Sequence, residues 1–174
     1  MRKISDVNIS EDTDRILHSD IFEKAKHQPH HRDTTVAAHS ADVARSAMKV
    51  CDLLEKHGIH TDKDKVVLAS LCHDLGMVGR DEKYDSQYET CMEHPEESVE
   101  AVKEVLGEID EETADMIRSH MWPMSKDMPD SKEALIVTLC DKTESVKDTL
   151  AWLGRRSLDT CIAVRDIFNG NRIR

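Results

Sequence analysis

Hydrophobic residues recur along this chain at the spacing of amphipathic helices. The clearest stripe has steps of seven, four, three and four residues and consists of Val36, Val43, Ala47, Val50 and Leu54. No segment shows the sustained alternation of apolar and polar residues that is typical of a half-buried strand. About seven helices are predicted, over residues 13–26, 34–57, 62–75, 95–107, 110–121, 131–153 and 155–168. The pattern therefore predicts an all-α fold.

Local sequence signals set several of the expected helix boundaries. Asp33 or Thr34 is expected to cap the helix over 34–57, because short polar side chains can accept a hydrogen bond from the first turn. Pro95 is expected in the first turn of its helix, where a missing N–H costs nothing. Residues 77–93 are polar and are expected to form a loop that covers a pocket.

Size and composition agree with one helical domain. The chain has 174 residues, of which 39% are hydrophobic, and this is enough to bury a single core. Six glycines and four prolines are too few for an all-β protein with many tight turns. Since no linker or repeat divides the sequence, one domain is expected over residues 1–174, with the first and last helices packed on it.

Charge and apolar content narrow the classes of partner. The formal net charge is −11, and no basic run is longer than Arg155-Arg156, so duplex nucleic acid is not an expected partner. No apolar stretch approaches the ~20 residues that span a bilayer, and no signal-peptide pattern opens the chain. The five cysteines include no CxxC pair, and reduced thiols in the cytoplasm are the simplest interpretation.

Several histidines and aspartates occupy positions where the pattern predicts burial or a helix end. These residues are His39, His73, Asp74, His94, His120 and Asp141. A buried carboxylate costs several kcal/mol unless a positive group neutralises it, and no lysine or arginine obviously shares the faces of the two aspartates. A single buried histidine is usually only a hydrogen-bonded core residue, but six such side chains could satisfy one another around metal ions. Imidazole and carboxylate without thiolate suit iron, manganese, zinc or cobalt.

The order of these residues resembles the HD-domain superfamily of metal-dependent phosphohydrolases. His73-Asp74-Leu75-Gly76 is similar to the signature of that superfamily, and the two later histidines, His94 and His120, are typical of its dinuclear subset. The resemblance covers about residues 31–148 and is greatest to small bacterial HD-domain hydrolases. It implies a single-domain HD-type helical bundle.

The resemblance also implies how two divalent metal ions would be shared. The first ion is expected to be held by His39, His73, Asp74 and Asp141. The second is expected to be held by Asp74, His94 and His120, with Asp74 bridging the pair. Iron is expected ahead of manganese, cobalt, nickel, zinc or magnesium, and His73 and Asp74 are the expected catalytic centre together with Arg80.

One position departs from the superfamily pattern. Many HD hydrolases have a lysine three residues after the signature aspartate, whereas this chain has Met77. A cation that contacts a phosphate must then come from elsewhere. The expected candidates are Arg80 first, then Lys142, with His31 at the mouth of the pocket.

Other polar residues near the predicted ligands have less certain roles. Asp33, Asp42 and Glu144 are candidates for orienting a ligand imidazole, and their spacing selects none of them. The segment 27–31, with histidines at 27, 30 and 31, is expected to be a polar loop rather than a third metal site.

Three functions follow from the resemblance. The leading hypothesis is hydrolysis of a phosphate ester or anhydride, in a nucleotide or related small molecule, by a hydroxide that bridges the two metals. The alternatives are a mixed-valent di-iron oxygenase of the same superfamily and a non-catalytic nucleotide-binding HD domain.

A homodimer is a further expectation, because an apolar stripe on the last helix, Leu158, Ile162 and Ile167, could pair with a second copy or pack down on its own domain.

Overall fold

The computed structural model describes residues 10–30 and 33–168, and it describes side chains as far as Leu158. Within these residues the chain forms α-helices and two short 3-10 helices with no named strand, which confirms the all-α prediction. The elements are α1 Glu11–Leu17, α2 Asp20–Ala25, α3 Val36–Lys56, α4 Lys63–Cys72, η1 Leu75–Met77, α5 Arg80–Lys83, α6 Gln87–Leu106, α7 Glu111–Arg118, η2 Ser119–Met121 and α8 Lys132–Phe168.

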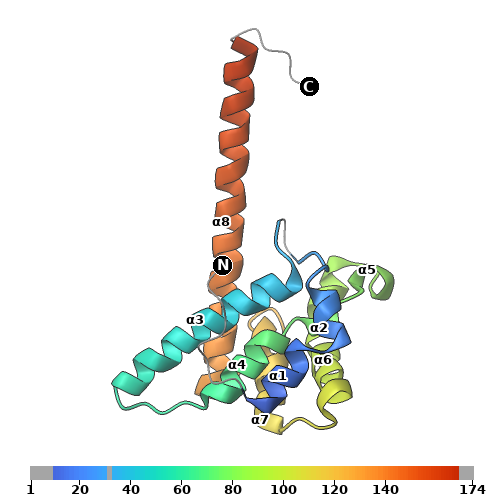
Figure 1. Ribbon diagram of the computed structural model, residues 1–174, viewed down its shortest axis with the longest axis vertical. Helices are drawn as coiled ribbons and strands as arrows, with labels where there is room; N and C mark the ends of the chain where they lie inside the picture. Colours follow the sequence, from blue (N-terminus) through green and yellow to red (C-terminus); the bar gives the residue numbers. More distant parts are fainter. Residues whose placement is uncertain (1–9, 31–32, 169–174) are drawn as a thin grey trace.

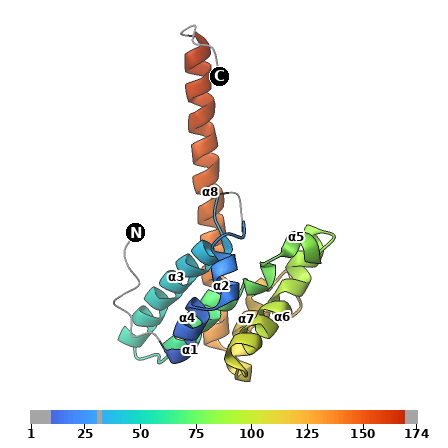
Figure 2. The same ribbon diagram turned by 45° about the vertical axis from the view of Figure 1, so that its right-hand side comes forward.

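Helices α3, α4, α6 and α7 and the first part of α8 form the body of the molecule (Figures 1 and 2). Helix α4 packs between α3 and α7, while η1 packs along α6. The predicted stripe of α3 faces this core: Val36, Val43 and Ala47 are buried, and Val50 and Leu54 pack against its edge. The core thus brings the ends of α4 and η2 and the sides of α3, α6 and α8 close together.

The N-terminal segment contains two helices, so the single helix predicted over 13–26 is wrong. The hydroxyl of Ser19 accepts a hydrogen bond from the backbone N–H of Phe22 and starts α2. The same hydroxyl donates to the carbonyl of Ile16 at 2.6 Å and closes the end of α1. A capping serine in the middle of an amphipathic pattern therefore divides it.

The helix predicted over 34–57 is α3, and its cap is Thr35 rather than Asp33 or Thr34. The Thr35 hydroxyl accepts from the N–H of Ala38 at 3.3 Å. Thr35 also pairs with Pro29 in an isolated antiparallel bridge, so the cap residue belongs to a short hairpin that precedes the helix.

The segment expected to be a loop over 77–93 is instead largely helical. It contains α5 and the first two turns of α6, which starts after the cap Ser86. Pro95 lies inside α6 rather than at its start, and that prediction is wrong. Proline removes one helical hydrogen bond but does not prevent the helix from continuing where the rest of the helix is held by packing.

Helix α8 is one continuous helix, so the two helices predicted over 131–153 and 155–168 are wrong. Gly154 lies within it, with no atom near enough to contact an added side chain, and it does not interrupt the helix. The second half of α8 extends away from the body (Figure 1), so residues 155–168 do not form a separate helix packed on the bundle. Leu158 is exposed, and the side chains of Ile162 and Ile167 lie outside the described part. Among the described helices, none is both long and apolar enough to cross a membrane.

Candidate metal centre

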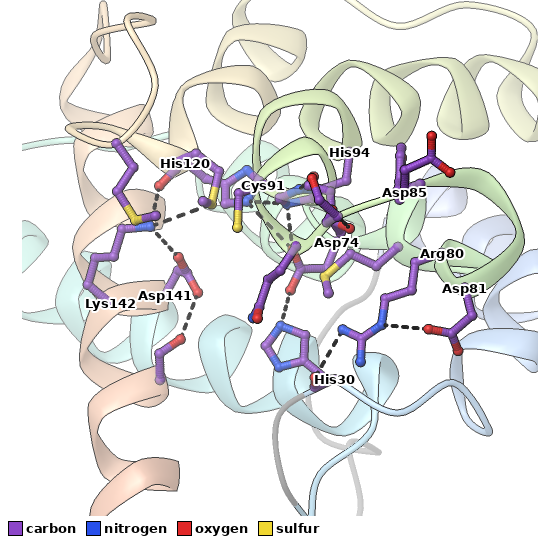
Figure 3. A pocket seen from close by; sticks show the side chains of 18 residues that line it. His30, Asp74, Arg80, Asp81, Asp85, Cys91, His94, His120, Asp141 and Lys142 are labelled. Carbon is purple, nitrogen blue, oxygen red and sulfur yellow. Dashed lines mark hydrogen bonds and ion pairs between the residues drawn. The ribbon is translucent and has the colours of Figure 1, made fainter.

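All six predicted ligand side chains meet inside the body of the molecule. His39 comes from the first turns of α3, His73 and Asp74 follow α4 directly, and His94 lies in the middle of α6. His120 lies in η2 and Asp141 in α8. None of these residues is more than 6% exposed. Five separate helical segments therefore supply one buried cluster of imidazoles and carboxylates. Figure 3 shows the members that line the pocket, Asp74, His94, His120 and Asp141.

The carboxylate of Asp74 lies at the centre of the cluster and its two oxygens face different histidines. Oδ1 lies 3.1 Å from Nε2 of His94 and 3.6 Å from Nε2 of His120. Oδ2 lies 3.1 Å from Nε2 of His73 and 2.8 Å from Nε2 of His30. The carboxylate thus separates two groups of ring nitrogens, one on each oxygen.

Asp141 belongs to the group on the Oδ2 side. Its Oδ1 atom lies 3.0 Å from Nε2 of His39 and 3.8 Å from Nε2 of His73. On the other side, the Nε2 atoms of His94 and His120 are 3.0 Å apart. On each side of the Asp74 carboxylate, three potential ligand atoms lie within 4.8 Å of one another. The group on the Oδ2 side consists of His39, His73 and Asp141, and the group nearer Oδ1 consists of His73, Asp74 and His120.

In three of these histidines, a hydrogen bond at the Nδ1 atom fixes the tautomer of the ring. His73, His94 and His120 each place Nδ1 against a backbone carbonyl three or four residues earlier, at 2.9, 2.6 and 2.6 Å. A carbonyl can only accept, so Nδ1 carries the proton and, in the neutral ring, Nε2 presents its lone pair to the centre of the cluster. Within the described residues, Nε2 of His73 and Oδ2 of Asp74 are buried without a well-formed hydrogen bond, although Oδ2 lies at ion-pair distance, 2.8 and 3.1 Å, from Nε2 of His30 and of His73. Such a donor set fits divalent cations.

A carboxylate that the sequence did not indicate lies behind His39. Oδ2 of Asp148 is 3.4 Å from Nδ1 of His39. The three residues expected in such a role lie elsewhere: Asp33 pairs with Arg155, Asp42 with Arg45, and Glu144 with Ser46 and Lys147. Asp148 follows Asp141 by seven residues, or two helical turns, and this spacing on one helix face is the signal that could have found it.

Electrostatics keep both central carboxylates ionised. Burial alone would raise the pKa of Asp74, but the charges of His73 and His30 outweigh it and hold that pKa well below its usual range. Burial likewise opposes ionisation of Asp141, and the hydrogen bond from His39 and the charge of His73 lower its pKa. Two negative charges therefore persist in the buried cluster.

The imidazoles divide into two kinds. Burial lowers the pKa of His73, but the charges of Asp74 and Asp141 outweigh this effect and raise it to about 9. Burial, with the neighbouring positive charge of His73, lowers the pKa of His120 to about 4. A protonated His73 offers no lone pair, so a metal ion must displace its proton when it binds.

A cavity of about 640 Å³ opens onto the cluster. Its wall includes Asp74, Arg80, Lys142 and several residues between 84 and 91, within the segment 77–93 that was expected to be a loop. Figure 3 shows Arg80 and Lys142 on opposite sides of Asp74. Both cations already have partners: Nη1 of Arg80 donates to the carbonyl of His30 at 3.1 Å, and Nζ of Lys142 lies 2.8 Å from Oδ2 of Asp141. His31, the third expected substrate contact, lies outside the described residues.

His30 is a second residue whose place in the cluster the sequence did not predict. It was expected in a polar loop, but it is only 6% exposed and its ring stacks on His39 with centroids 4.1 Å apart. The periodicity that identified the other histidines could not find it, because it precedes α3 and belongs to no helix.

The glycine of the signature allows two ligand segments to approach closely. A Cβ on Gly76 would lie 2.2 Å from the backbone oxygen of His94, far closer than a Cβ atom approaches a non-bonded oxygen. The N–H of Gly76 donates to the hydroxyl of Ser98 at 2.8 Å, and this hydroxyl lies 2.7 Å from the carbonyl oxygen of His73. Gly76 and Ser98 thus fix the position of η1 and the His73-Asp74 pair against α6.

Comparison with protein families agrees with this architecture. The family model described as the HD domain matches residues 36–145, which is more than half of the chain. The chain therefore belongs to the HD-domain family, whose members are mostly metal-dependent hydrolases. No match was found among curated proteins or among solved structures.

Proposed function

We propose that this protein is a hydrolase of phosphate esters or anhydrides that uses two divalent metal ions. The observation that carries the proposal is the division of the Asp74 oxygens between two groups of histidines. His39, His73, Asp74 and Asp141 would hold the first ion, and Asp74, His94 and His120 the second. Only a carboxylate offers two oxygens in this way, so Asp74 is the residue that would join the two ions.

The bound ions would supply a nucleophile from water at neutral pH and would neutralise charge on a phosphoryl group. The chain contributes the remaining chemistry. Burial of the cluster lowers the local dielectric and strengthens each charge interaction inside it. Lys142 and Arg80 place positive charge on two sides of the cavity, where they can bind the phosphate oxygens of a substrate. No side chain is required as nucleophile.

The cavity limits the size of the substrate. A volume of about 640 Å³ lies within the range of small-molecule sites and can hold a nucleotide or a related phosphorylated compound. The imidazole and carboxylate donors suit iron, manganese, zinc or cobalt, and the resemblance to HD-domain hydrolases places iron ahead of manganese, cobalt, nickel, zinc or magnesium. The free state of the described cysteines, Cys51, Cys72, Cys91 and Cys140, agrees with a reducing compartment such as the cytoplasm.

Release of phosphate tests the proposal. Protein freed of metal is loaded in turn with ferrous iron, manganese, cobalt and nickel and then offered nucleotides, dinucleoside polyphosphates, cyclic nucleotides and sugar phosphates. We expect metal-dependent hydrolysis of at least one class, and its loss in Asp74→Asn. Metal binding without hydrolysis of any compound would contradict the proposal, and substrate-dependent oxygen uptake by the ferrous protein would favour the oxygenase alternative. Tight nucleotide binding without turnover would favour a non-catalytic binding domain.

A further inference from the structure

A short hairpin before α3 carries His30 into the cluster. The N–H of His30 donates to the carbonyl of Thr34 at 3.0 Å, and the N–H of Val36 donates to the carbonyl of Gln28 at 3.0 Å. The side chain of Gln28 accepts from the N–H of Gly79 at 3.0 Å and ties the hairpin to the segment after η1. Hydrogen bonds thus fix the backbone at Gln28 and at His30 itself.

The ring of His30 faces the same oxygen of Asp74 as His73 does. Nε2 of His30 is 2.8 Å from Oδ2 of Asp74, and the side chains of both residues are 4% exposed. His30, His39 and Asp74 form a further group whose potential ligand atoms lie within 4.8 Å of one another. The stacking of His30 on His39 places the two imidazoles on one side of the carboxylate.

We infer that His30 is an additional protein ligand of the first metal ion. This inference rests on the proposed metal centre and extends it. The first ion would then have five protein ligands, His30, His39, His73, Asp74 and Asp141, whereas the second would have three. An ion with six positions would keep one free at the first site and three free at the second. Substrate oxygens would accordingly bind chiefly to the second ion, and the first would be held more tightly.

Arg80 acquires a different role from the one expected of it. Its guanidinium donates to the backbone carbonyl of His30, so it holds the residue that reaches the metal. We assign Arg80 as a positioning residue for His30, in addition to its place in the cavity wall.

Nuclear magnetic resonance of the histidine nitrogens tests the inference on the full chain. Zinc alone is the probe, added to two equivalents, and the ¹⁵N resonances of His30, His39 and His73 are followed. We expect Nε2 of all three to move into the range of metal-bound imidazole nitrogen. Movement of the His39 and His73 signals with an unchanged His30 signal would overturn the inference and leave the proposed function standing. If no histidine signal moved, the metal centre itself would be contradicted, and both proposals would fall.

Zinc affinity supplies a second, independent test. His30→Ala should weaken binding of the first ion by about tenfold or more and leave the second within about threefold. His27→Ala is the matched control, because His27 lies on the same segment with a side chain 81% exposed. Circular dichroism of the metal-free proteins verifies that both variants fold. Equal first-site affinities in well-folded His30→Ala and His27→Ala would overturn the inference.

The positioning role of Arg80 has its own readout. In Arg80→Ala, the His30 Nε2 signal should return part of the way toward its metal-free position, while the His39 and His73 signals stay metal-bound. A merely structural role for Arg80 would move all three signals together or none of them, and either result would overturn the assignment.

Discussion

Single residues in this protein carry identifiable tasks, and Gly76 is the clearest example. An added Cβ would collide with backbone atoms, which cannot rotate away as a side chain could. We expect Gly76→Ala to lower the free energy of unfolding by about 2 kcal/mol or more, because overpacking forces the backbone to shift. Urea denaturation measures this change.

Gly154 provides the matched control for Gly76. An added Cβ there has no atom within 4 Å, and the residue lies in the exposed part of α8. Gly154→Ala should raise helix stability by up to about 1 kcal/mol. Equal effects of the two substitutions would contradict the close approach of η1 and α6.

Asp148 should act on the metal through His39. Removing its charge in Asp148→Asn weakens the hold on the Nδ1 proton of His39, so we expect the first ion to bind about 10–100-fold more weakly. Competition with a chelator measures the affinity. Glu144→Gln is the control, since Glu144 lies one turn earlier and bonds to Ser46 and Lys147 instead. Unchanged affinity in Asp148→Asn would show that His39 is oriented by other contacts.

At the level of residues, burial made the cluster predictable. His39 and Asp141 interrupt apolar helix faces, and a polar side chain at such a position needs a partner nearby. His30 and Asp148 were missed because neither interrupts an apolar face. His30 lies before α3 and outside any helix, and Asp148 lies on the partly exposed stretch of α8 that follows Glu144. Their places depend on tertiary contacts that periodicity does not encode.

Helix boundaries were predicted best where a capping side chain is not accompanied by a competing proline or glycine. Asp110 caps α7 and Ser131 accepts from the N–H of Ala134 at the start of α8, and both lie at the first residue of a helix predicted over 110–121 or 131–153. The start of α6 was missed because Pro95 is a stronger local signal than Ser86, although Ser86 is the actual cap. Gly154 led in the same way to a predicted break between two helices, whereas glycine weakens a helix without ending it.

The cap of α7 gives a stability prediction. Asp110 accepts from the N–H of Thr113 at 3.2 Å and from Nζ of Lys65 at 2.9 Å. Asp110→Ala should lower the free energy of unfolding at pH 7 by about 1 kcal/mol, as expected for a lost N-cap. Thermal or urea unfolding of the metal-free protein measures the difference.

The same difference should depend on pH with a definite sign. Burial opposes ionisation of Asp110, but the hydrogen bonds from Thr113 and Lys65 outweigh it and lower its pKa below the ordinary 3.8. A folded-state pKa below the unfolded value gives stability that is present above pH 3.8 and is lost as the pH falls through the folded pKa. The gap between the parent protein and Asp110→Ala should therefore narrow in acid. A constant gap from pH 7 to pH 3 would contradict the role of the carboxylate.

For the whole molecule, the site and the long extension of α8 are separable. The furthest described side chain that contacts the cluster is Asp148, and the family match ends at residue 145. A chain that ends at Ser157 should therefore bind the same number of metal ions as the full chain. Elemental analysis after gel filtration tests this, and loss of metal in a folded truncated protein would contradict it.

The homodimer expected from the apolar stripe of the last helix stays a prediction. Leu150 and Leu158 are exposed on α8, and sedimentation of the full and truncated chains determines whether this helix associates.

The all-α class could be predicted because periodicity and composition agreed. The projection of α8 could not, since a sequence shows which face of a helix is apolar but not which neighbour covers it.

The central claim is that two metal ions lie between the histidine groups that Asp74 separates. The most direct measurement is the metal content of gently purified protein by elemental analysis, beside His94→Ala, His120→Ala and the exposed control His60→Ala, whose side chain is 86% exposed. The account predicts two ions per chain in the parent and the control, and one in each of the other variants. Fewer than two ions in fully loaded parent protein, or two in His94→Ala and His120→Ala, would contradict it.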